Sequence, residues 1–128
     1  MAAVMAGRRI LVVDDNADAA GAVAMLLESE GHDVRTASTG TLALTEVTRW
    51  SPDVVLLDIG LPDMDGYEVA RAITALPVSP APLLIALSGY GRPDDLQQAR
   101  EAGFAHHLLK PAEPAALFAL LGPVHAVG

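Results

Sequence analysis

The sequence contains no cysteine, few aromatic residues and few basic ones. Without cysteine it has neither a disulfide framework nor a thiolate metal site, which fits a reducing compartment, so we expect a cytoplasmic protein. Aromatic residues make up only 4% of the chain, so its core must be built from Ala, Val, Leu and Ile. Seven arginines and one lysine are scattered along a chain whose formal net charge is -8. Because nucleic acids and anionic membranes are bound through clustered Lys and Arg, we expect neither as a partner.

Long apolar stretches are absent as well. The first residues, "MAAVMAGRRILVVDD", place two arginines after a short apolar stretch, and the next apolar run ends in two acids. This pattern fits neither a signal peptide nor a membrane span. The chain length suits one domain. We expect an N-terminal extension at 1–8, a single domain at 9–122 and a C-terminal tail at 123–128.

Short apolar runs alternate with helical patterns along the whole chain. Continuous apolar runs at 10–13, 54–57 and 83–87 predict central strands that are buried on both faces. The stretches 33–37 ("DVRTA") and 106–109 ("HHLL") are partly polar and predict edge strands. Between them, a period near 3.6 predicts helices at about 16–30, 39–50, 65–76, 93–103 and 113–121. Gly31 and Gly103 stand where helix C-terminal caps are expected.

This alternation predicts parallel strands joined by right-handed crossovers. The fold class is therefore α/β, a doubly wound five-stranded parallel sheet of the flavodoxin-like (βα)5 type. With the second strand at an edge, we expect the strand order 2-1-3-4-5. In such a sheet, ligands bind at the carboxyl ends of the strands beside the switch point, which here lies between the first and third strands.

Polar residues follow four of these strands. Asp14 and Asp15 come after the first, Asp58 after the third, Ser88 after the fourth and Lys110 after the fifth. Carboxylates that converge at one edge repel one another unless a cation lies among them, and carboxylate oxygens are the ligands that Mg²⁺ prefers. A hydroxyl and an ammonium group could then hold the oxygens of a transferred phosphoryl group. The pattern indicates a metal site that handles phosphate.

Four segments carry a resemblance to a known family. The acidic pair, "LLDIGLPDMDG" around Asp58, "ALSGYG" around Ser88 and "HLLKP" around Lys110 together resemble the receiver domain of two-component response regulators, over about 9–121. The resemblance implies phosphorelay signalling in which Asp58 accepts a phosphoryl group from a histidine kinase or histidine phosphotransfer domain. Ser88 and Lys110 would hold the phosphoryl oxygens. Such a domain is not an enzyme, except that it assists its own phosphorylation and dephosphorylation.

The resemblance also implies a cofactor and a switch. Mg²⁺ would be bound by Asp15, Asp58 and the backbone carbonyl of Gly60, with Asp14 acting through water. Many receivers have an aromatic residue three positions before the lysine, and here that residue is His107. We therefore predict that Ser88 and His107 form the switch.

Two further expectations follow from the family pattern. Side chains two positions after the phosphoacceptor and two after the hydroxyl residue tune phosphoryl lifetime in receivers. Since the first of these is Gly60, we expect Tyr90 to set the lifetime here. The surface built by the fourth helix, fifth strand and fifth helix would serve a homodimer or a partner domain.

Two other functions are alternatives to a phosphorylated receiver. Mg²⁺-dependent aspartyl-phosphate phosphohydrolases also use an aspartate nucleophile, but they have a second Asp two positions later, where this chain has Gly60. A receiver-like binding module that is never phosphorylated is the other alternative, although every phosphoryl-handling side chain is present. The chain could be a stand-alone regulator or part of a hybrid histidine kinase.

Overall fold

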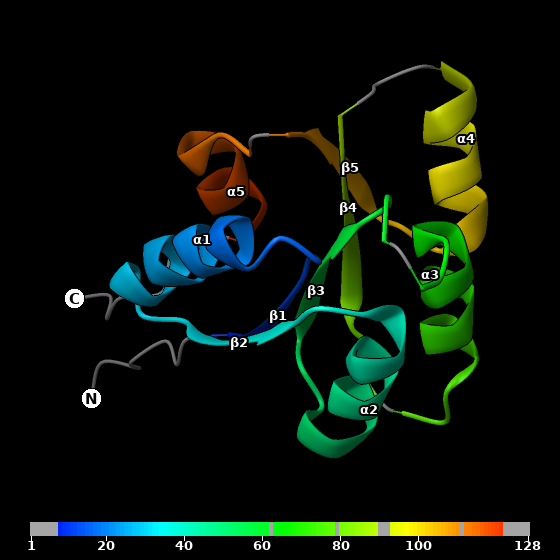
Figure 1. The fold of residues 1–128 in the computed structure, drawn as a ribbon, viewed down its shortest axis with the longest axis horizontal. Coiled ribbons are helices and arrows are strands. Elements are labelled where there is room, and N and C mark those ends of the chain that lie inside the picture. The colour runs from blue at the N-terminus through cyan, green and yellow to red at the C-terminus, as the bar shows by residue number, and fades with distance from the viewer. Residues whose placement is uncertain (1–7, 62, 79, 90–92, 111, 122–128) are drawn as a thin grey trace, which may run out of the picture.

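The fold is a single parallel sheet between two layers of helices (Figure 1). The computed structural model describes residues 8–61, 63–78, 80–89, 93–110 and 112–121, with the backbone alone at 93–96. The strands are β1 (Arg9–Val13), β2 (Asp33–Ala37), β3 (Val54–Asp58), β4 (Leu83–Ser88) and β5 (His106–Leu109). The helices are α1 (Ala17–Ser29), α2 (Gly40–Trp50), α3 (Gly66–Ala75), α4 (Pro93–Ala102) and α5 (Pro114–Leu121). The predicted extension and tail lie largely outside the described residues.

The strand order is β2-β1-β3-β4-β5 and all four pairings are parallel. This confirms the predicted order and the predicted edges, β2 and β5. All five residues of β3 are buried, whereas the edge strands are largely exposed or half-buried. Continuous apolar runs therefore correctly predicted central strands, and mixed runs correctly predicted edge strands. The reason is that only central strands are covered on both faces.

Two hydrophobic clusters fill the space between the sheet and its helices. One contains Leu11, Val55 and Ala86 together with residues of α2, α3 and α4. The other contains Val12 and Leu56 together with residues of α1 and α5. Figure 1 shows the same division, with α1 and α5 on one side of the sheet and α2, α3 and α4 on the other. Alternate residues of each central strand thus supply opposite cores.

Helices α1, α2 and α3 begin at capping side chains, and left-handed residues follow α1, α2 and α4. Asn16 accepts a hydrogen bond from the N–H of Ala19, and Asp65 accepts one from the N–H of Tyr67. The φ angles of Gly31 and Gly103 are 94° and 109°, as expected for C-terminal caps. Ser51, the C-terminal cap of α2, also has a left-handed conformation, with φ 53°. The sequence does not predict this conformation, because the residue is not a glycine.

The last helix serves mainly the core. Leu117 and Leu121 are fully buried, while Phe118 and Leu120 are half-buried against the same cluster. The apolar residues of α5 are thus largely used inside the domain. In the part of the chain that the structure describes, every helix is too short or too polar to cross a bilayer.

Candidate functional site

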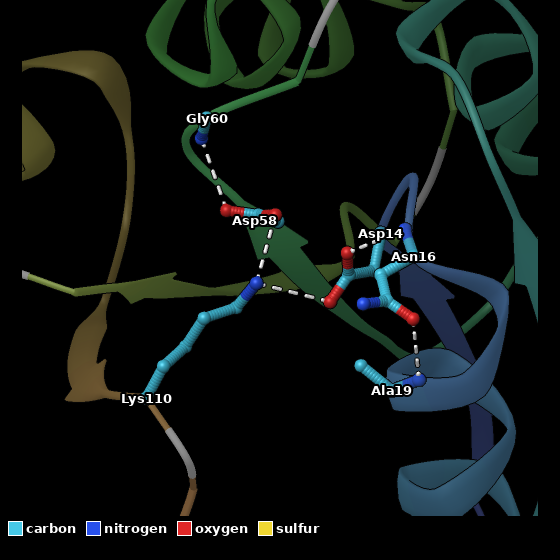
Figure 2. Close-up of polar contacts among 6 residues, drawn as sticks. All are labelled: Asp14, Asn16, Ala19, Asp58, Gly60 and Lys110. Atoms are coloured by element: carbon cyan, nitrogen blue, oxygen red, sulfur yellow. Dashed lines mark hydrogen bonds and ion pairs between the residues drawn. The ribbon is translucent and has the colours of Figure 1, made fainter.

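The site lies where the central strands end. Asp14 follows β1 and Asp58 is the last residue of β3, and these two strands are neighbours in the sheet. Ser88 ends β4, which pairs with β3, and Lys110 follows β5. Because parallel strands all end at the same edge, residues far apart in sequence are brought together there, as Figure 2 shows for Asp14, Asp58 and Lys110.

The acidic cluster predicted from the sequence is present. Asp14, Asp15 and Asp58 each offer a carboxylate oxygen, and these oxygens all lie within 4.8 Å of one another. Asp14 and Asp58 are buried, with 4% and 7% of their surface exposed, whereas Asp15 is exposed. Two of the three carboxylates are therefore largely removed from water. An unpaired charge in such a buried position is costly.

Lys110 supplies a cation inside this cluster. Its Nζ atom lies 2.8 Å from Asp58 Oδ2 and 3.0 Å from Asp14 Oδ2 (Figure 2). Burial alone would lower the pKa of Lys110, but hydrogen bonds with Asp58 and Asp14, and their charges, outweigh it and raise the pKa above 10.5. The sequence predicts that Lys110 lies at the site, but it does not predict that the ammonium group lies between the two buried carboxylates.

Backbone contacts fix the position of Asp58. Its Oδ1 atom accepts a hydrogen bond of 3.0 Å from the N–H of Gly60, and Ile59 N–H donates to Leu87 O at 3.0 Å. Gly66 N–H donates to Ile59 O at 3.0 Å, which ties the start of α3 to the end of β3. The carboxylate therefore has one oxygen held by Gly60 and the other by Lys110.

Asp63 anchors the loop after β3 to a second helix, a role that the sequence analysis did not predict. The Asp63 carboxylate accepts hydrogen bonds from Gly40 N–H at 2.9 Å and from Thr41 N–H at 3.2 Å, at the start of α2. The Gly40 bond is the main reason why the pKa of Asp63 lies below its usual value. Nothing local marks this role, since Asp63 and Gly40 belong to different βα units.

The two predicted switch residues contact each other. Ser88 Oγ lies 2.7 Å from His107 Nε2, and both side chains are half-buried. Tyr90, which we expected to set phosphoryl lifetime, lies outside the described residues. Among the predicted site residues, the structure thus joins Asp14, Asp58 and Lys110 in one group, and Ser88 and His107 in a second.

The donor set of the cluster suits a hard divalent cation. Three carboxylates meet, and Lys110 neutralises only part of their charge. Oxygen ligands of this kind are what Mg²⁺ prefers. In the part of the chain that the structure describes, this is the one group of at least three acidic or metal-ligating side chains close enough to share an ion.

The strand order and the acidic pocket at its switch point define a doubly wound α/β domain of the CheY-like type. The chain belongs to the response regulator receiver domain family, whose sequence profile matches residues 10–122. It is therefore a receiver domain of two-component signalling, with an acidic pocket typical of the Mg²⁺ site in such domains. A receiver domain is a signalling module rather than an enzyme, which removes the phosphohydrolase alternative.

Individual relatives agree with this assignment. The chain is 37% identical over 112 residues to an uncharacterised 14.6 kDa protein of Leptolyngbya boryana, covering 88% of this chain and 86% of that one. It is 38% identical over 112 residues to the DNA-binding response regulator MtrA of Mycobacterium tuberculosis, covering 88% of this chain. It spans only 48% of the length of MtrA.

A solved structure shows the same fold. The chemotaxis protein CheY4 of Vibrio cholerae superimposes with a TM-score of 0.85 at 28% identity, covering 91% of this chain and 97% of that one. The match extends over nearly all of both chains, so the whole sheet and its helices are shared.

Proposed function

We propose that this receiver domain accepts a phosphoryl group on Asp58. The observation that carries the proposal is the setting of the Asp58 carboxylate, which is buried at the end of β3 and held by Lys110 Nζ at 2.8 Å and Gly60 N–H at 3.0 Å. An Asp58 oxygen would attack the phosphorus of a phosphohistidine. The P–N bond would break and an acyl phosphate would form.

The other site residues would act on the transferred group. Lys110 would turn from the carboxylates to a phosphoryl oxygen, which it can do because it is a flexible point charge. Ser88 would donate a hydrogen bond to a second oxygen. When Mg²⁺ is bound, by Asp15, Asp58 and the Gly60 carbonyl with Asp14 acting through water, it would neutralise the charge of the incoming phosphoryl oxygens.

A histidine kinase partner follows from the receiver family. We propose that the direct donor is a phosphohistidine on such a kinase or on a histidine phosphotransfer domain. We further propose that the phosphorylated domain docks with a second copy or a partner domain through α4, β5 and α5. Leu109 on β5 supports this surface, because its side chain is apolar and 54% exposed.

Intact mass spectrometry tests the phosphorylation. The chain is incubated with Mg²⁺ and acetyl phosphate, and we expect an acid-labile gain of one phosphate. Asp58→Asn keeps the size of the side chain and should show no gain. A chain that never gains phosphate would overturn the proposal and favour a binding module that works unphosphorylated.

Size-exclusion chromatography with light scattering tests the docking surface. We expect the phosphorylated chain to dimerise, and Leu109→Ser to reduce dimerisation without reducing phosphorylation. A fully phosphorylated chain that stays monomeric would refute the homodimer and leave a partner domain as the occupant.

A further inference from the structure

The contact between Ser88 and His107 gives the site a hydroxyl whose proton can point in two directions. Ser88 Oγ and His107 Nε2 lie 2.7 Å apart on the neighbouring strands β4 and β5. In the pairing of these strands His107 is opposite Ala86, two residues before Ser88, so both side chains lie on the same face. At this distance one of the two groups must donate to the other.

The direction of this bond decides what Ser88 can do next. A serine hydroxyl has a single proton, and a neutral imidazole carries a proton on only one of its two nitrogens. If Nε2 has no proton, Ser88 donates to His107 and has none to offer a phosphoryl oxygen. If Nε2 carries the proton, His107 donates to Ser88 and the hydroxyl proton is not used in this contact.

We propose that His107 is a positioning residue which, by donating from Nε2 to Ser88 Oγ, directs the Ser88 proton to the phosphoryl group on Asp58. The inference rests on the proposed phosphorylation of Asp58. Ser88 is well placed for this task, since it directly follows Leu87, which pairs with Asp58 in the sheet. Phosphorylation should therefore favour the form of His107 with a proton on Nε2, and that form should favour phosphorylation in return.

The surroundings of His107 allow such a change of proton position. The ring lines an open cavity of about 330 Å³ between α4 and β5, together with Ala99, Arg100, Phe104, Ala105 and His106. Among the described side chains at this cavity, Arg100 and His106 are the other groups that can carry charge. Moving the ring proton from Nδ1 to Nε2 through water adds no positive charge beside Arg100. The solvent in the cavity can carry that proton.

Nitrogen NMR on the unmodified chain tests the proposal directly. The histidine rings are labelled with ¹⁵N, and Mg²⁺ with beryllofluoride serves as the phosphoryl analogue on Asp58. We expect the Nε2 signal of His107 to have the shift of a protonated nitrogen in the loaded state. An Nε2 signal typical of an unprotonated nitrogen, with the analogue demonstrably bound, would overturn the inference.

Variants separate hydrogen bonding from shape. His107→Phe cannot bond to Ser88, and we expect its phosphorylation by acetyl phosphate to be about tenfold slower, the effect of one lost hydrogen bond. His107→Gln retains an N–H donor and should recover most of the rate. His106→Phe is the matched control, because His106 directly precedes His107 on β5, its side chain is exposed, and adjacent side chains of a strand point to opposite faces.

The outcomes distinguish this inference from the proposed function. If His107→Phe is phosphorylated as fast as the unmodified chain, the positioning role is refuted while phosphorylation of Asp58 stands. If His107→Gln is as slow as His107→Phe, the ring acts through its shape, and the role in directing the Ser88 proton is refuted. If the unmodified chain itself gains no phosphate, the proposed function has failed first.

Discussion

Replacing Gly66 by alanine should destabilise the domain and disturb its site. A Cβ atom at Gly66 would lie 2.5 Å from Ile59 Cα and 3.0 Å from the carbonyl oxygens of Asp58 and Ile59. These are backbone atoms, so no side chain can rotate away to make room. Either α3 or the end of β3 must move, and the end of β3 carries Asp58.

The expected magnitude follows from two opposing effects. Forcing an extra methyl group into a packed site costs about 1–3 kcal/mol. Alanine is about 1 kcal/mol better than glycine in the interior of a helix, and Gly66, as the first residue of α3, gains only part of this. We therefore expect Gly66→Ala to lower the free energy of unfolding by about 1–2 kcal/mol.

Gly21→Ala is the matched control. Gly21 lies inside α1, and a Cβ atom there would meet nothing within 4 Å. The same substitution should therefore raise stability by about 0.5–1 kcal/mol. Urea unfolding followed by circular dichroism measures both variants. A Gly66→Ala midpoint equal to or above that of the unmodified chain would refute the reasoning, as would unimpaired phosphorylation by acetyl phosphate.

Three further predictions concern charged groups. Asp63→Asn should lower the urea midpoint at neutral pH, because the Gly40 N–H holds the pKa of Asp63 below 3.8. The loss should shrink as the pH falls through that lowered pKa, and a pH-independent loss would contradict this. Burial lowers the pKa of His32 below 6.5, so thermal stability should fall as the pH drops below 6.5. In His32→Gln it should fall less, and equal slopes would count against the prediction. Lys110→Met should leave two buried carboxylates without their cation. Mg²⁺ should therefore raise the melting temperature of this variant more than that of the unmodified chain. Equal shifts in melting temperature would refute this.

The sequence carried most of the fold, because hydrophobic periodicity reports burial directly. The run 54–57 is apolar at every position and β3 is buried at every position, whereas the mixed run 106–109 became the edge strand β5. Predicted helix ends differ from the observed ones by about one residue. The reason is local, since capping residues such as Asn16 and Asp65 belong to the pattern but lie just outside the helix.

The site could be predicted in its membership but not in its contacts. Strand ends alone place Asp58 and Lys110 at one edge of a parallel sheet. Which oxygens the ammonium group contacts depends on the path of the loop after β5, and the sequence does not encode that path in any local pattern. The same holds for Asp63, whose partners at the start of α2 lie 22 and 23 positions away. Such pairings depend on tertiary packing.

The most direct test of the account is to locate the phosphoryl group on the chain. Borohydride reduces an acyl phosphate to an alcohol, so a phosphorylated aspartate becomes homoserine, which tandem mass spectrometry can assign to a position. After treatment with Mg²⁺ and acetyl phosphate, the account predicts homoserine at position 58 alone. Conversion at Asp14 or Asp15, or no conversion at all, would contradict it.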